Sequence, residues 1–139
     1  MMFSKMSGRS WSGPPLSFPT SGWTMAIKRI WHGWTTRENA AAYWTVLSET
    51  VIPGIEAKSI QGYLGIEILR RDHEAEVEFV TIMTFDSIQS VINFQGEDYA
   101  RSYVPDVAQK VLSHWDQTAA HFEVLDERAL NERRPWAAG

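Results

Sequence analysis

The sequence predicts one α+β domain whose strands and helices follow the order β-α-β-β-α-β. Two observations predict it. Apolar residues recur with the period of a strand in four segments and with the period of a helix in the segments between them. The chain of 139 residues, 44% hydrophobic and 22% charged, also has the length and composition of a single globular domain. We place this domain at residues 25–127.

The two ends of the chain differ from this domain. Ser, Gly and Pro dominate residues 7–22 without periodicity, so residues 1–24 are predicted to be a flexible N-terminal extension. Met25 is interpreted as the natural start, with the preceding segment as a wrongly assigned upstream extension. The alternative is a true arm that packs on a partner through its aromatic side chains. Residues 128–139 are predicted to be a C-terminal tail.

The first strand is predicted at residues 26–34, which form a β-prone run. Thr35-Thr36-Arg37-Glu38 then has a capping-box pattern, with Thr35 as the N-cap and Glu38 bonding back to it. The helix that follows carries an inward stripe at helical spacing, and Pro53-Gly54 is predicted to end it. The stripe consists of Ala40, Trp44, Leu47 and Val51.

A hairpin is predicted next, with strands at residues 60–71 and 77–85 and a turn at residues 72–74. The later strand has apolar residues on both sides, which is typical of a strand covered on both faces. The alternating side chains are Leu64, Ile66 and Ile68 in the earlier strand, and Phe79, Thr81, Met83 and Phe85 opposite Val80 and Ile82 in the later one.

The remaining elements are shorter. Asp86-Ser87 is predicted to cap a helix that ends at Gly96, and Pro105 to open another helix. Residues 119–125 are the last predicted strand, on which Phe122 faces the interior. The last helix is predicted to extend to Trp115, with an inner stripe of Val107 or Ala108, Val111 and Trp115.

Right-handed crossovers fold this order into a ferredoxin-like, four-stranded antiparallel sheet with helices on one face. The other face would lie bare, and monomeric proteins seldom expose large apolar patches. We therefore expect a second copy of the chain to cover that face, which makes the protein a homodimer.

Composition argues against several function classes. Without cysteine the chain has no disulfide, zinc–thiolate site or cysteine nucleophile, and it suits a cytoplasmic location. The net charge of −4 argues against nucleic-acid binding, and no apolar run approaches the roughly 18 residues that span a membrane. No phosphate-binding glycine loop or nucleophile elbow is present. We expect no cofactor and no metal ion.

Four short motifs stand on the first strand, at the two ends of the third strand and on the last strand: Ile30-Trp31-His32-Gly33, Glu76-Val77-Glu78-Phe79, Thr84-Phe85-Asp86-Ser87 and His121-Phe122-Glu123-Val124. With the order of elements, they resemble the antibiotic biosynthesis monooxygenase-like superfamily over residues 25–126. The resemblance implies a dimeric α/β barrel of ferredoxin-like units. Members include cofactor-independent oxygenases of polycyclic phenols and anthrones, haem-degrading monooxygenases and many proteins of unknown role.

The sequence departs from two branches of that superfamily. The haem-degrading branch has an Asn on strand one, a Trp ending strand three and a His in the next helix; this chain has Trp31, Phe85 and Tyr103 or Val104 there. The departure argues against haem binding and haem cleavage. The phenol-oxygenase branch also has a Trp in place of Phe85, so a plain ring replaces an indole N–H donor here.

His32 is the first candidate for chemistry. In an oxygenase without cofactor the substrate supplies the electrons, so the protein needs only to remove a proton and hold the anion in a dry pocket. A histidine titrating near neutral pH suits proton removal, so His32 is the predicted base. Trp31, Trp34, Tyr63 and Phe85 are predicted to line the substrate pocket. The structural alternative is that His32 is a half-buried sheet residue hydrogen-bonded to a neighbour.

His121 and two tyrosines complete the predicted site. His121 is predicted to approach His32, where the pair binds substrate, shares a proton or, with Glu123, holds a metal ion; the alternative is a dimer-interface pair. Tyr99 and Tyr103 lie one helical turn apart and are predicted to close the pocket and donate hydrogen bonds to an oxyanion. Their alternative role is packing against the sheet edge.

Together these residues predict a cofactor-independent monooxygenase for an aromatic or polyketide-like small molecule. The alternative is a non-enzymatic dimeric protein of the same fold that binds an apolar small molecule or is purely structural, because fold alone does not fix function. An enclosed cavity of roughly 300 Å³ or more beside His32 would favour the oxygenase.

Overall fold

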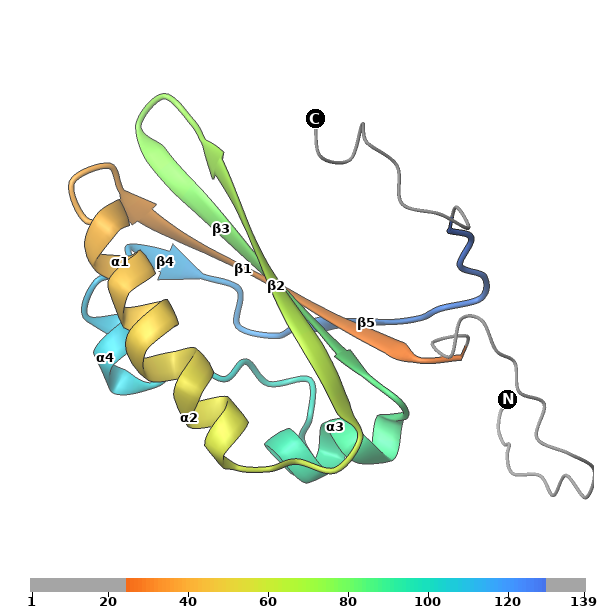
Figure 1. Cartoon of the computed structure of the whole chain (residues 1–139). Helices are drawn as coiled ribbons and strands as arrows, with labels where there is room; N and C mark the ends of the chain where they lie inside the picture. The colour runs from red at the N-terminus through yellow and green to blue at the C-terminus, as the bar shows by residue number, and fades with distance from the viewer. Residues whose placement is uncertain (1–24, 130–139) are drawn as a thin grey trace, which may run out of the picture. The chain divides into compact units, whose positions relative to one another are not determined.

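Three long antiparallel strands form most of the sheet in the computed structural model, which describes residues 25–129. The central strand β1 (Ile27–Thr36) pairs along its whole length with β3 (Glu76–Phe85), which in turn pairs with β2 (Tyr63–Asp72). Two short strands, β4 (His114–Trp115) and β5 (Ala120–Glu123), pair with the other side of β1 (Figure 1). The sheet is open in the single chain, with β2 at one edge.

The helices all lie on one face of this sheet (Figure 1). One continuous helical run joins α1 (Ala40–Val46), the π-helical turn η2 (Leu47–Val51) and α2 (Ile52–Ala57). The second half of the chain contributes α3 (Ile88–Gln95) and the single turn α4 (Asp106–Gln109). Within residues 25–129, no helix is long and apolar enough to cross a membrane.

This arrangement confirms the predicted α+β, ferredoxin-like sheet with helices on one face. The order of strands along the sheet is β2-β3-β1-β4, and β5 continues the row after β4 along the same side of β1. The fourth predicted strand is therefore split in two. Residues 25–124 form one compact unit. The predicted extension at residues 1–24 and most of the predicted tail lie outside the described residues.

Strict alternation along β1 defines two faces of the sheet. We name them the helix-covered face and the helix-free face. On β1 the helix-covered face carries Ile27, Arg29, Trp31, Gly33 and Thr35, and the helix-free face carries Lys28, Ile30, His32, Trp34 and Thr36. Val77, Phe79, Met83 and Phe85 of β3 extend the first face, so the core lies between β1, β3 and the helices. Each such fully buried side chain stabilises the fold by roughly 1.5–3 kcal/mol.

Pro53-Gly54 does not end the first helix, which continues to Ala57. Proline breaks a helix because it lacks an N–H and its ring clashes with the carbonyl four residues earlier. Here the wider π-helical turn η2 directly precedes α2, and its larger turn accommodates the proline ring within the continuous helical run. The prediction of a stop was therefore wrong.

The predicted capping box is also absent, because Thr35 belongs to β1. Its side chain is fully buried, and its Oγ1 donates to the carbonyl oxygen of Val111 at 2.6 Å. Thr36 serves the helix start instead, since its Oγ1 accepts a bond from the N–H of Asn39 at 3.0 Å. The strand is longer than predicted because pairing with β3 continues to Thr36.

Trp44, which was predicted to point inward, and Leu64, which was predicted to alternate with Ile66 and Ile68 on one side of a strand, both point outward. Trp44 is 47% exposed, and Tyr43 takes its place in the inward stripe, because positions 40, 43, 47 and 51 also have helical spacing. In β2, which begins three residues later than predicted, a bulge lies between Tyr63 and Gly65. The bulge leaves Leu64 exposed while Ile66 still packs on the core.

The end of the domain differs most from the prediction. The last helix is one turn long, and His114 and Trp115 form β4 rather than a helical stripe. The pairing of Gly33 with Trp115 shows that β1 captures this segment as an edge strand. Phe122 of β5 lies on the helix-free face and is 55% exposed, so its predicted burial is wrong for the single chain.

Candidate functional site

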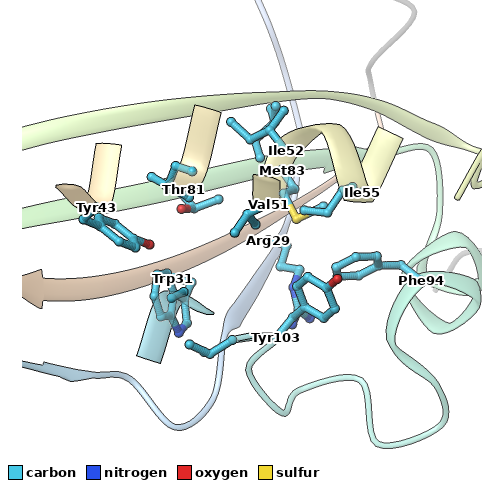
Figure 2. Close-up of a pocket in the computed structure, with 14 residues that line it drawn as sticks. Arg29, Trp31, Tyr43, Val51, Ile52, Ile55, Thr81, Met83, Phe94 and Tyr103 are labelled. Carbon is cyan, nitrogen blue, oxygen red and sulfur yellow. The ribbon is translucent and has the colours of Figure 1, made fainter. Parts of the chain in front are cut away.

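A small cavity lies on the helix-covered face, between the helical run and the sheet (Figure 2). Its volume is about 40 Å³, room for roughly three water molecules. Thirteen of its fourteen lining residues are uncharged, and most are aliphatic or aromatic. They are Arg29, Trp31, Tyr43, Leu47, Val51, Ile52, Ile55, Ile66, Thr81, Met83, Phe94, Tyr103, Val104 and Ala108.

Arg29 is the one charged lining residue. Its place at an inward position of β1 buries it, so that 3% of its surface is exposed. Its Nη1 donates to the carbonyl oxygen of Tyr99 at 2.5 Å, and its Nη2 donates to the carbonyl oxygen of Arg101 at 2.9 Å. The irregular segment after α3 thus supplies backbone acceptors to the guanidinium, which satisfies part of its hydrogen-bonding capacity.

Burial shapes the charge of this region. Loss of hydration lowers the pKa of Arg29 to about 10, so the guanidinium stays protonated at neutral pH. The Nη1 of Arg29 also lies 3.0 Å from Nε2 of His121, and the central guanidinium carbon, Cζ, lies 5.4 Å from the centre of the Phe94 ring. Burial first, and then the charge of Arg29, lower the pKa of His121. His121 is therefore neutral at pH 7 and accepts this hydrogen bond.

The indole ring of Trp31 is held between a hydrogen bond to the segment after β4 and the backbone of Gly33 in its own strand. Its Nε1 donates to the carbonyl oxygen of Asp116 at 3.0 Å. Its ring crosses over Gly33, where a Cβ atom would approach the ring to 2.7 Å. Glycine at this position therefore allows the indole to lie flat along the wall of the cavity.

Three hydroxyl groups belong to the cavity wall: those of Tyr43, Thr81 and Tyr103. Tyr43 is 1% exposed and its ring meets the edge of Phe79 at 4.9 Å, which fixes its direction. Figure 2 shows its hydroxyl oxygen pointing from the helix toward Thr81 and Trp31. Burial raises the pKa of Tyr43, so this hydroxyl remains a protonated donor.

Five other predicted residues lie on the same side of the sheet as Trp31. The ring centroids of Tyr63 and Phe85 lie 5.7 Å apart. The ring of Phe94 lies between those of Phe85 and Tyr103, with centroid distances of 5.8 Å and 5.0 Å. Tyr99 meets the ring of His121 edge-on at 5.1 Å. Of the predicted site residues, Trp31 and Tyr103 line the cavity, and Tyr63, Phe85, Tyr99 and His121 surround it.

His32 and Trp34 lie on the helix-free face. His32 Nδ1 is 2.6 Å from Oε2 of Glu78, and the second oxygen of that carboxylate is 2.8 Å from Nε2 of His73. The hydrogen bonds from His73 and His32 lower the pKa of Glu78. Trp34 stacks on His114 at 4.6 Å, and His114 Nε2 lies 2.8 Å from Oε2 of Glu76. His32 therefore has the half-exposed, hydrogen-bonded surroundings of its structural alternative.

A wide depression adjoins His32. Its volume is about 600 Å³, but it is open to solvent in the single chain rather than enclosed. The gap arises where the chain leaves β1 between β4 and β5. It is lined by Ile30, His32, Asp116, Gln117, Thr118, Ala119, Ala120 and Phe122.

The structure does not bring His32 and His121 together. In the register of β1 with β5, His121 is opposite Arg29, whereas His32 points to the other face. Glu123 lies on the same face as His121 and therefore also points away from His32. The predicted cluster of His32, His121 and Glu123 is thus wrong. No group of three or more metal-ligating side chains forms among residues 25–129.

Sequence reasoning missed Arg29 and Tyr43. Arg29 stands between Ile27 and Trp31 at alternate positions of one strand, and that alternation was the signal that it faces the core. Tyr43 was passed over because Trp44 fits a helical stripe equally well. For both residues a buried polar group was the less expected outcome.

Comparison with known proteins gives likenesses of structure. No protein-family model matches the chain, and no curated protein matches it. A candidate antibiotic biosynthesis monooxygenase from Bacillus cereus superimposes with a TM-score of 0.50 and 12% identity, over 76% of this chain and 99% of that one. The cofactor-independent oxygenase SnoaB from Streptomyces nogalater gives a TM-score of 0.47 and 13% identity, over 78% and 100% of the two chains.

A third protein, a candidate antibiotic biosynthesis monooxygenase from Chloroflexus aurantiacus, gives a TM-score of 0.45 and 15% identity, over 76% of this chain and 97% of that one. The chain shares the fold of the Bacillus cereus protein, in agreement with the fold that its sequence motifs predicted. At such low identity, the likeness concerns the fold alone.

Proposed function

We propose that this protein, with its antibiotic biosynthesis monooxygenase-like fold, oxidises an aromatic or polyketide-like small molecule with dioxygen and without a cofactor. The reaction takes place at the cavity on the helix-covered face. The observation that carries the proposal is one buried guanidinium, that of Arg29, in a wall otherwise made of uncharged side chains.

Such a wall suits a reaction in which the substrate must first become an anion. A positive charge stabilises a developing oxyanion far more strongly in a dry, apolar site than in water. Arg29 keeps its charge at neutral pH, and Tyr43 and Tyr103 in the same cavity wall carry hydroxyls that can donate to other oxygen atoms of the substrate.

The chemistry balances without an added reductant. For the CH₂ group of an anthrone, which is conjugated through the two aromatic rings with a carbonyl group, loss of a proton gives an enolate, which transfers electrons to O₂ and combines with it. One oxygen atom remains as the new carbonyl group and the other leaves as water with the two hydrogens of the CH₂ group. The protein residues bind the anion and exclude water, and the substrate is the electron donor.

A substrate ring needs more room than the cavity of about 40 Å³ provides. We place the entrance at Tyr103 and Val104, because these lining residues belong to the irregular segment before α4, not to a helix or strand. Displacement of this segment opens the cavity toward solvent while β1 and β3 keep Arg29 in place.

Oxygen uptake with a panel of anthrones and hydroquinones tests the proposal. We expect uptake by the wild type without added cofactor, and loss of at least about tenfold in rate for Arg29→Met. His32, the base predicted from sequence, lies on the other face, so His32→Ala separates the two sites. An unchanged rate assigns the reaction to the cavity, whereas loss in His32→Ala with full activity in Arg29→Met assigns it to the depression.

One observation favours a second function, the non-enzymatic binding or structural protein predicted as the alternative. The cavity of about 40 Å³ is far below the roughly 300 Å³ of typical ligand pockets. If no member of the panel supports oxygen uptake and none raises the unfolding temperature, the aromatic side chains serve the core alone.

We also propose that the protein is a homodimer that buries the helix-free face. Phe122 and Leu69 are 55% and 46% exposed on that face, and the depression beside His32 opens on the same side. Sedimentation equilibrium is expected to give twice the chain mass, and Phe122→Asp to give a folded single chain. A wild-type protein that sediments as one chain at high concentration contradicts the proposal.

A further inference from the structure

The positive charge of Arg29 is not matched by a negative one. Its guanidinium contacts two backbone carbonyl oxygens and a neutral histidine ring. Among residues 25–129, no carboxylate forms an ion pair with it. A buried charge without a counter-charge costs stability, so its presence at a cavity wall points to a function such as binding an anion.

A count of N–H groups shows what remains free. A guanidinium has five N–H donors. Two on Nη1 are used by Tyr99 and His121, and one on Nη2 is used by Arg101. The N–H of Nε and the second N–H of Nη2 have no acceptor among the described residues. These donors sit on two nitrogens bonded to the same planar carbon, which is the fork that binds two oxygens of one anion.

A second free donor faces the same cavity. The Tyr43 hydroxyl is almost completely buried and forms no hydrogen bond within the described part of the chain. Buried polar groups are nearly always hydrogen-bonded, so an unpartnered one aimed into a cavity indicates that a ligand atom or a water molecule accepts its hydrogen bond there. Tyr43 comes from α1 and packs on Phe79 at one end of the cavity, whereas Arg29 comes from β1 and lies beside Tyr103 and Phe94 at the other end, so the guanidinium is the donor group that an anion there meets.

We propose that Arg29 binds a planar anion through two oxygen atoms at once. This inference rests on the proposed function and names its substrate class: an aromatic compound in which a hydroxyl and a carbonyl group, or the two oxygens of a 1,3-dicarbonyl, lie side by side. The anion formed by loss of one proton spreads its charge over both oxygens and matches the fork. A single isolated phenolate does not.

The size of the cavity allows the fork to be tested without the substrate. Formate and nitrate are planar anions with adjacent oxygens, and they fit in the volume of a few water molecules, as about 40 Å³ provides. Chloride carries the same charge but cannot accept two divergent bonds in the plane of the fork. The three anions therefore separate charge from geometry.

The experiment follows the Nε–H signals of the arginines in ¹⁵N-labelled full-length protein by NMR during titration with formate, nitrate or chloride at constant ionic strength. We expect a saturable shift of the Arg29 signal with formate and nitrate, and binding of chloride at least about tenfold weaker. Arg29→Lys keeps the charge without the fork and should lose about tenfold in affinity for formate.

Two further variants serve as controls. Arg37→Lys changes an exposed arginine whose Nε already donates to the carbonyl oxygen of Glu74, and it should leave formate affinity unchanged. Tyr43→Phe removes a hydroxyl at the other end of the cavity and should also leave formate affinity unchanged, because one small anion cannot contact both groups. The wild-type Arg29 signal is informative even if a variant fails to fold.

The outcomes separate this inference from the proposed function. Absence of any anion-dependent shift at Arg29, or equal affinity for formate in wild type and Arg29→Lys, overturns the inference. If the protein takes up oxygen but does not bind formate, the inference that Arg29 binds two oxygen atoms is overturned, and the proposed oxygenase activity stands. Formate binding at Arg29 without oxygen uptake on any substrate supports the anion site and overturns the oxygenase.

Discussion

The two faces of the sheet carry the same mixture of residue types but use it differently. On the helix-covered face, side chains such as Phe85 and Val77 are fully buried, and one cation, Arg29, is enclosed among them. On the helix-free face, Ile30 and Ile82 remain partly exposed beside the hydrogen-bonded side chains of His32 and Glu78. Alternate residues of β1 thus experience a dry and a wet environment a few ångströms apart.

The comparison teaches where charge is informative. The contacts of His32 and His73 with Glu78 are partly exposed to solvent, and each ring nitrogen in them has a carboxylate partner, so they suit a structural role or an interface. Arg29 on the dry side lacks such a partner among the described residues, and a buried unmatched charge is the better indicator of a ligand. The predictions below probe this contrast in order of expected size.

The largest contrast is expected between two phenylalanines. Phe85→Ala should cost about 3–5 kcal/mol in free energy of unfolding, because a completely buried ring leaves a cavity. Phe122→Ala, on the helix-free face, should cost less than about 1 kcal/mol in the single chain. Urea unfolding of both variants at low protein concentration measures the difference. Equal losses would show that the helix-free face is as well buried as the other.

The threonine pair at the end of β1 gives the next effect. Thr35→Val should cost about 1–3 kcal/mol, because the carbonyl oxygen of Val111 loses its buried donor. Thr36→Val removes only the bond to the N–H of Asn39 at the helix start and should cost about 0.5–1 kcal/mol. Thermal unfolding ranks the two. A larger loss for Thr36→Val would reverse the assignment of the faces.

A charge on the helix-free face should act through pH. The pKa of Glu78 is lowered in the folded state, so its contribution is present above the unfolded pKa and is lost as the pH falls through the folded pKa. Glu78→Gln should cost about 1 kcal/mol at pH 7, and its difference from wild type should shrink below about pH 4.5. Glu67→Gln, an exposed residue of β2, is the matched control and should show no such trend.

The smallest effect is expected from His121, and it has a different pH window. Its pKa is lowered in the folded state, so the unfolded chain binds the proton more readily and stability falls as the pH drops below about 6.5. His121→Gln keeps an acceptor for Arg29 and should flatten this fall, by less than about 1 kcal/mol because the ring is partly exposed. Chemical unfolding between pH 7.5 and 5.5, as approximate limits, measures the slope; an unchanged slope contradicts the placement of His121 beside Arg29.

Much of the fold could be predicted because it depends on periodicity. Phe79, Met83 and Phe85 alternate in sequence and share the buried face in the structure. The errors arise where two local rules fit equally well. Trp44 and Tyr43 both suit a helical stripe, and Pro53 stops a helix except after a wide turn such as η2.

The candidate site was predicted in part. The sequence directed attention to Trp31 and Tyr103, which line the cavity, and to His32, which does not. Which face is dry depends on which side the helices cover, and a single strand pattern with apolar residues at both sets of positions does not decide that. His32 stood out because of its chemistry, whereas Arg29 is recognised only once its burial is known.

By itself the sequence determined the order of the elements up to the third strand and which residues of β1 and β3 share a face, because those follow from the short periods of backbone geometry. Only the tertiary structure decided which polar groups meet. Arg29 receives acceptors from residues 70 and 72 positions away along the chain. Contacts of that kind depend on strand register and on the course of irregular segments, which no local period encodes.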